Sequence, residues 1–65
     1  MTKRQLQAYY LALCAELERE TSMDAVDEMS VDVIKSRCKE LEERLDDEGV
    51  KNAKASIEFW EGFIS

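Results

Sequence analysis

The side chains of this 65-residue chain that could do chemistry are two cysteines, fifteen carboxylates and a few hydroxyls, and there is no histidine. The commonest general base is therefore missing, and neither Cys14 nor Cys38 has an imidazole to activate its thiol. A zinc site of mixed Cys/His type is excluded for the same reason. Both cysteines stand on or beside apolar stripes. We therefore expect two buried, reduced thiols, with a disulfide as the alternative.

Carboxylates are frequent in the connector at 21–29 and in the first turn after it, and they are Asp24, Asp27, Glu28 and Asp32. The group resembles a cation site, but it lacks the alternating aspartates, the glycine and the bidentate glutamate of a calcium-binding EF-hand loop. A solvated acidic loop explains it better, so we predict no metal site here.

Recognisable catalytic motifs are also missing. The sequence has no nucleophile elbow, no phosphate-binding glycine loop and no H-E-x-x-H pattern. Serines and threonines precede expected helices, where capping accounts for them. A helical chain of this length should have little room for a pocket of several hundred Å³. We therefore expect a protein that is not an enzyme and that needs no cofactor.

The charge balance narrows the choice of partners. The formal net charge is −6, which argues against direct binding to nucleic acid and against adhesion to an anionic membrane surface. No apolar run approaches the roughly 18 residues of a membrane span, and no secretory signal opens the sequence. We expect a cytoplasmic protein.

The clearest helix is predicted at 31–46. Its apolar residues recur at helical spacing on one side; they are Val31, Ile34, Cys38, Leu41 and Leu45. Ser30 is a typical N-cap residue, and Gly49 is expected to stop the helix in the left-handed conformation.

Two further helices are predicted at about 3–20 and 50–64, with a possible short helical turn at 23–28. Thr2 and Gln5 fit a capping box at the start of the first helix. The sequence has no proline and no extended alternation of apolar and polar residues. The fold class is therefore all-α, a small three-helix domain that comprises residues 1–65.

The first and last helices each have apolar residues outside the main stripe. Leu11 lies more than about 100° from the centre of the first stripe on an ideal helical wheel, so either a second element or another subunit should cover it. In the last helix, Lys51 and Lys54 near the start and Glu58 and Glu61 near the end oppose the helix dipole. Packing should therefore hold that helix in place.

Large apolar side chains in these two helices are the candidate binding residues. Phe59 and Phe63 share a face that differs from the core-facing stripe of Trp60, and aromatic anchors at this spacing are typical of helix-in-groove recognition. Their alternative role is to wrap the core of a very small domain. The predicted partner-binding residues are Tyr9, Leu11, Phe59, Trp60 and Phe63.

The function that follows is binding of a protein partner, as a small acidic regulator, inhibitor or adaptor. A homodimer is expected, because a core of this size is marginal alone. The alternatives are a DNA mimic that presents its carboxylates to a nucleic-acid-binding protein, and a purely structural assembly subunit.

Overall fold

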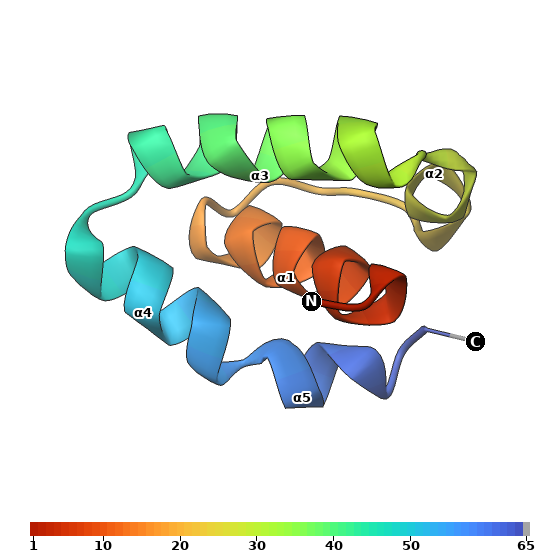
Figure 1. Ribbon diagram of the computed structural model, residues 1–65. Helices are drawn as coiled ribbons and strands as arrows, with labels where there is room; N and C mark the ends of the chain where they lie inside the picture. The colour runs from red at the N-terminus through yellow and green to blue at the C-terminus, as the bar shows by residue number, and fades with distance from the viewer. Residues whose placement is uncertain (65) are drawn as a thin grey trace.

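A computed structural model describes residues 1–64, and Figure 1 shows its helices. They are α1 (Lys3–Glu16), α2 (Met23–Glu28), α3 (Val31–Arg44), α4 (Asp47–Ala55) and α5 (Ile57–Glu61). Residues 1–64 contain no strand, so the all-α prediction is confirmed. The short turn predicted at 23–28 is also confirmed as α2.

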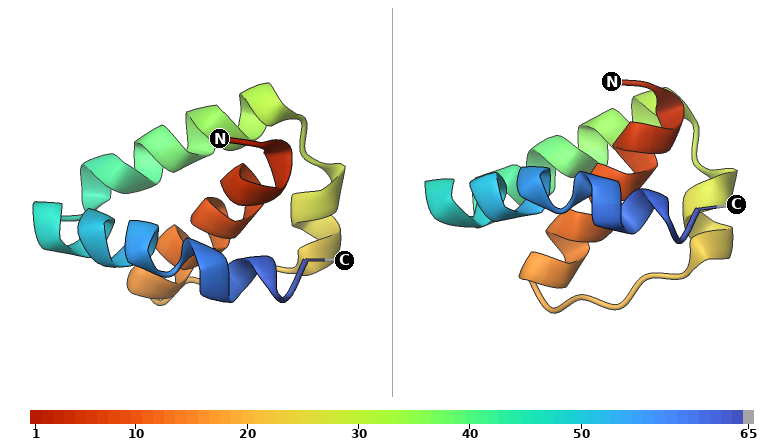
Figure 2. Two further views of the ribbon diagram at one scale, coloured as in Figure 1. Left: turned by 60° about the horizontal axis from the view of Figure 1, so that its bottom comes forward. Right: turned by 90° about the horizontal axis from the view of Figure 1, so that it is seen from below.

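The helices form two arms with α1 held between them. Along one side runs α3, along the other run α4 and α5, and the two arms join at the turn after α3 (Figures 1 and 2). Helix α1 packs against α3, α4 and α5. The short α2 lies across the end where the arms open (left view of Figure 2). The organising element is therefore α1, although α3 has the cleaner amphipathic pattern.

Burial of α1 on all sides follows from this position. Nine consecutive residues, from Leu6 to Cys14, are buried, as expected for a helix that has neighbours around its whole circumference. Leu11 is only 4% exposed. It is thus covered from within the chain, and another subunit is not needed to cover it.

The core extends from α1 into both arms. Its other buried apolar residues come from α2, α3, α4 and the segment after α5, and they are Val26, Ile34, Cys38, Leu41, Ala53 and Ile64. Leu13, Ile34 and Val26 are the largest side chains that are almost completely buried.

Helix α1 ends at Glu16, so the predicted end at residue 20 is wrong. The N–H of Glu18 donates to the Ala15 carbonyl (3.1 Å) and the N–H of Arg19 donates to the Cys14 carbonyl (2.8 Å). These are the two hydrogen bonds of a Schellman motif. Glu18 takes the left-handed position at φ 56°. Glycine is usual there, so the residue type does not indicate the end of the helix.

The second error concerns Gly49, which does not end α3. Leu45 ends that helix in an extended conformation, and Asp46 then caps α4 through the N–H of Gly49, which donates to Asp46 Oδ1 (2.7 Å). Gly49 is buried inside α4, and a Cβ there would lie 3.1 Å from Leu45 Cδ2. Close packing against the Leu45 side chain therefore favours glycine at position 49.

The final helix is two helices, whereas the sequence predicted one at 50–64. The break falls at Ser56, whose hydroxyl donates to the Asn52 carbonyl (3.0 Å), a back-bond that tends to bend helices.

Helix α4 also starts earlier than predicted, at Asp47 and not at residue 50. Asp46, Asp47 and Glu48 give α4 a carboxylate cap and an acidic first turn, so capping and charge do support it, contrary to the prediction.

The remaining helix starts agree with the sequence. The Thr2–Gln5 capping box is complete, and Ser30 Oγ accepts the N–H of Val33 (3.3 Å). A further hydrogen bond joins the two ends of the chain, because Arg4 Nη2 donates to the Glu61 carbonyl (2.9 Å). That bond ties the start of α1 to the end of α5, and so helps to hold the segment that carries Phe59, Trp60 and Phe63.

Candidate functional site

An exposed cluster of aromatic rings occupies α5 and the turn after it. Phe59 is 63% exposed and Phe63 is 55% exposed. Their ring centroids lie 5.2 Å apart, and each lies 5.4 Å from the centroid of Trp60. The Phe59 ring meets Trp60 edge to face, with an interplanar angle of 89°, which is a favourable aromatic geometry. We call Phe59, Trp60 and Phe63 the aromatic face.

The aromatic face is held by the core beneath it. Trp60 is partly buried and packs against the core, as does Ile57 one turn earlier. Ile64 is buried just beyond α5, at 8% exposed. These contacts fix one side of α5 against the molecule, and the spacing of the residues then turns Phe59 and Phe63 outward.

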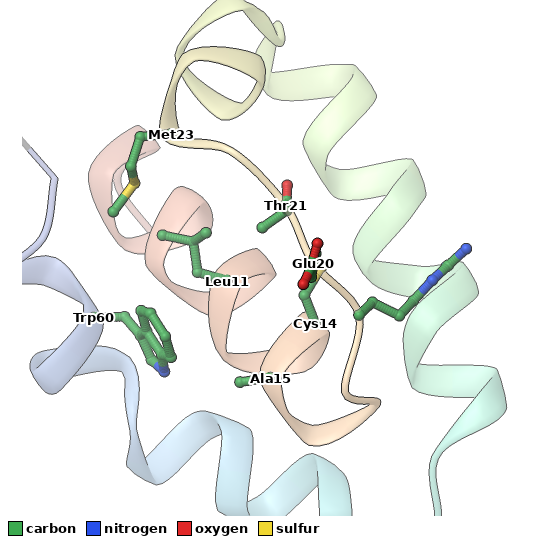
Figure 3. A pocket seen from close by; sticks show the side chains of 8 residues that line it. Leu11, Cys14, Ala15, Glu20, Thr21, Met23 and Trp60 are labelled. Carbon is green, nitrogen blue, oxygen red and sulfur yellow. The ribbon is translucent and has the colours of Figure 1, made fainter.

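Trp60 also forms one wall of a pocket beside α1, with a volume of about 370 Å³. The close view in Figure 3 shows Trp60, Leu11 and Met23 on one side and the chain after α1 on the other. The complete lining is Leu11, Cys14, Ala15, Arg19, Glu20, Thr21, Met23 and Trp60. The pocket is larger than we expected for a chain of this length, although it lies at the small end for ligand sites.

Acidic side chains are frequent in the segments that form this region. The segment that leads from α1 to the pocket edge carries three exposed carboxylates, Glu16, Glu18 and Glu20, against the single exposed guanidinium of Arg19. On α5 itself, Glu58 directly precedes Phe59 and is exposed. The aromatic face and the pocket are therefore apolar in the middle. Their margins carry more carboxylates than cations, and the cations include Arg19 at the pocket and Arg4, which donates to the Glu61 carbonyl.

The structure divides the five predicted binding residues into two groups. Tyr9 and Leu11 belong to the core, at 5% and 4% exposed. They offer almost no surface to a partner in this fold, so the surface that we propose below leaves Tyr9 out and uses Leu11 only as pocket lining. Phe59, Trp60 and Phe63 come together in one cluster, which makes them the stronger candidates.

Sequence reasoning did not find the pocket. Its wall includes Met23, Ala15 and Thr21, which come from α2, the end of α1 and the chain between them. None of these positions carries a pattern that relates it to Trp60. Only the packing of α5 beside the end of α1 could reveal it.

The thiols are unsuited to nucleophilic chemistry. Cys14 and Cys38 are buried and free, as predicted. Burial, with a smaller effect of the Glu42 charge, raises the pKa of Cys38 from 9.0 to about 12, and burial also raises the pKa of Cys14. Both thiols are therefore protonated at neutral pH, whereas a reactive cysteine needs a thiolate.

One buried hydroxyl has no hydrogen-bond partner among residues 1–64, and it belongs to Tyr9. Burial, together with the nearby Glu42 carboxylate, raises the pKa of this phenol. Tyr9 does not line the pocket beside Trp60. It is therefore separate from the candidate site.

Neither a metal site nor a membrane span is found in the described part of the chain. Residues 1–64 contain no group of three or more Cys, Asp or Glu side chains placed to hold a metal ion. The acidic connector residues Asp24, Asp27, Glu28 and Asp32 are exposed. No helix within the same range has the length and apolar character needed to cross a bilayer.

Comparison of the chain with protein-family models, with curated proteins and with solved structures gives no match. The functional reading therefore depends on the geometry of the aromatic face and the pocket.

Proposed function

We propose that this protein is a small interaction module that binds a protein partner through the aromatic face. The observation that carries the proposal is the exposure of Phe59 and Phe63, 63% and 55%, on a domain in which most other large apolar side chains are buried or partly buried. Exposed aromatic side chains in a cluster are typical anchors of protein interfaces.

The energetics favour the same reading. Burial of a Phe side chain is worth about 1.5–3 kcal/mol, and the fold leaves most of this unrealised for two of them. A partner that covers both rings would recover it. The rings are held in place by Trp60 and by the core beneath, so binding would cost little additional ordering of the site.

A double variant, Phe59→Ala with Phe63→Ala, tests the proposal. The matched control is Val33→Ala, because Val33 is an exposed apolar residue, 41% exposed, on α3 away from the aromatic face. Tagged wild type and both variants are used to capture partners from the native cell extract, followed by quantitative mass spectrometry. We expect proteins that are enriched by wild type and Val33→Ala and lost with the double variant.

The far-UV circular dichroism of all three proteins should agree, since neither Phe ring is part of the core. Equal enrichment by the double variant and wild type would refute the proposed surface. Partners that are retained by the double variant and released by about 0.5 M salt would instead favour the DNA-mimic alternative, in which carboxylates carry the binding. Light scattering over a range of concentrations would show whether the partner is a second copy of this chain.

A further inference from the structure

We infer that the partner's binding element is a basic amphipathic helix, with one large apolar side chain in the pocket beside Trp60 and others against Phe59 and Phe63. The inference rests on the proposed function and specifies the chemistry of the partner. Three features of the described residues support it.

The first feature is continuity between the pocket and the aromatic face. Trp60 belongs to both: its ring centroid lies 5.4 Å from those of Phe59 and Phe63, and its side chain lines the pocket. Figure 3 shows the indole beside Leu11 and Ala15 of α1. A single element that lies over Trp60 can therefore reach the pocket on one side and the two Phe rings on the other.

The second feature is the shape and chemistry of the pocket. A volume of about 370 Å³ with walls from Leu11, Ala15, Met23 and Trp60 accepts an apolar side chain. Amphipathic helices bind through such anchors, spaced three, four or seven residues apart. Met23 adds a flexible wall, because methionine adapts its shape to different apolar groups.

The third feature is the charge around this surface. Four exposed glutamates lie in the segments that form this surface, against the cations Arg19 and Arg4, and they are Glu16, Glu18, Glu20 and Glu58. The whole chain has a formal net charge of −6. Charge complementarity favours Lys and Arg on the flanks of the bound helix. A second copy of this chain would instead bring the same carboxylates face to face, which disfavours self-association through this surface.

Selection from a displayed library of helical peptides of about 18 residues tests the inference without knowledge of the partner. That length is enough for a helix to form on binding. Peptides are selected on the wild-type protein and depleted on the variant Phe59→Ala with Phe63→Ala. We expect a consensus with apolar residues at helical spacing and with Lys or Arg on both flanks.

Synthetic copies of the selected peptides are then measured by the fluorescence of Trp60, the only tryptophan in the chain. We expect a shift of its emission to shorter wavelength on binding, because the indole loses contact with water. An increase in salt from about 0.05 M to about 0.5 M should weaken binding on the order of tenfold, through screening of the flanking charges.

Ala15→Phe is the pocket variant, since Ala15 is exposed at the pocket wall and a larger side chain would fill the space. Ser36→Phe, at an exposed position of α3 that does not line this pocket, is its control. We expect Ala15→Phe to weaken peptide binding at least tenfold and Ser36→Phe to leave it within about twofold.

The outcomes distinguish this inference from the proposed function. A neutral or acidic consensus, or equal binding by Ala15→Phe and wild type, overturns the basic helix or its pocket anchor and leaves the aromatic face as the interface. Failure to select any peptide that depends on Phe59 and Phe63 overturns the inferred helix, while capture of partners from the extract would still support the aromatic face. If no Phe-dependent peptide is selected and the double Phe variant also captures the same partners from the extract as wild type, both are contradicted.

Discussion

In α1, nine consecutive residues from Leu6 to Cys14 are buried, whereas none of the five residues of α5 is. Both helices are rich in large apolar side chains. The difference comes from position, because α1 lies between two arms of the fold and α5 forms the outer part of one arm. A helix at that position packs against the molecule on one side only. Its other side faces water, and Phe59 lies there together with Phe63 from the turn after the helix.

This contrast indicates how stability and binding are divided in the molecule. Apolar side chains of α1 contribute to the folded state of the chain alone, since they are already removed from water. Phe59 and Phe63 contribute little until something covers them. The four changes below test that division, from the largest expected effect on stability to the smallest.

Leu13→Ala should have the largest effect. Leu13 is 0% exposed in the last turn of α1, and loss of a buried Leu side chain costs about 2–5 kcal/mol. A core of this size supplies only about 3–5 kcal/mol, so we expect the variant to be largely unfolded by circular dichroism. Ile34→Val, which costs about 0.5–1.5 kcal/mol, should still fold and provides a measurable urea midpoint. A native-like melt of Leu13→Ala would contradict the central role of α1.

Asp46→Ala should have an intermediate effect. Its carboxylate accepts the N–H of Gly49 at 2.7 Å and caps α4, which connects α5 to the rest of the fold. Removal of such a cap costs about 1 kcal/mol, measurable as a lower urea midpoint with an unchanged slope. Asp46→Asn is the control, because it keeps an accepting oxygen and should lose much less. Equal losses for both variants would mean that the cap bond is not what stabilises the helix start.

Glu18→Gly should stabilise the protein. Glu18 adopts φ 56° after α1, a conformation that costs a non-glycine residue about 1–2 kcal/mol. Glycine avoids that cost but loses more chain entropy on folding, so we expect a net gain of about 0.5–1 kcal/mol by chemical denaturation. Glu16→Gly, inside α1, should be destabilising by a similar amount. A loss of stability in Glu18→Gly would indicate that the Glu18 side chain has a role of its own.

Phe59→Ala should have the smallest effect on stability, within about 0.5 kcal/mol, because the side chain is 63% exposed and surface substitutions are usually nearly neutral. The same variant should nevertheless weaken partner or peptide binding. If the melting temperature instead falls as far as it does for a core substitution, Phe59 belongs to the folding core and the division between the two helices fails.

Much of the fold could be predicted from local patterns. Ser30 and the Thr2–Gln5 capping box mark their helix starts correctly, because a capping bond involves residues only three positions apart. The apolar stripe of α3 identifies Ile34, Cys38 and Leu41 as buried for the same reason. The end of α1 cannot be predicted from residue type, because Glu18 occupies a position that usually needs glycine. The start of α4 is obscured because Gly49 resembles a helix stop, although Asp46 caps the helix.

The candidate site was predicted in part. Helical spacing showed that Phe59 and Phe63 share a face that differs from the core-facing side of Trp60, and the structure places both rings at the surface. Helical spacing also predicts Tyr9 and Leu11 as binding residues, but both are covered by other parts of the chain. Apolar residues on a second helix face indicate only that something must cover them, and a sequence does not say whether that is another helix of the chain or another molecule.

The sequence by itself determined the helices, the acidic balance and the presence of more apolar faces than one simple bundle seam requires, because these depend on residue type and on spacing within a few turns. Only the tertiary structure decided which of those faces is filled. It placed α1 between the two arms, which buries Leu11, and it brought α5 beside the end of α1, which creates the pocket at Trp60 and leaves Phe59 and Phe63 exposed. Those outcomes depend on contacts between residues far apart in the chain.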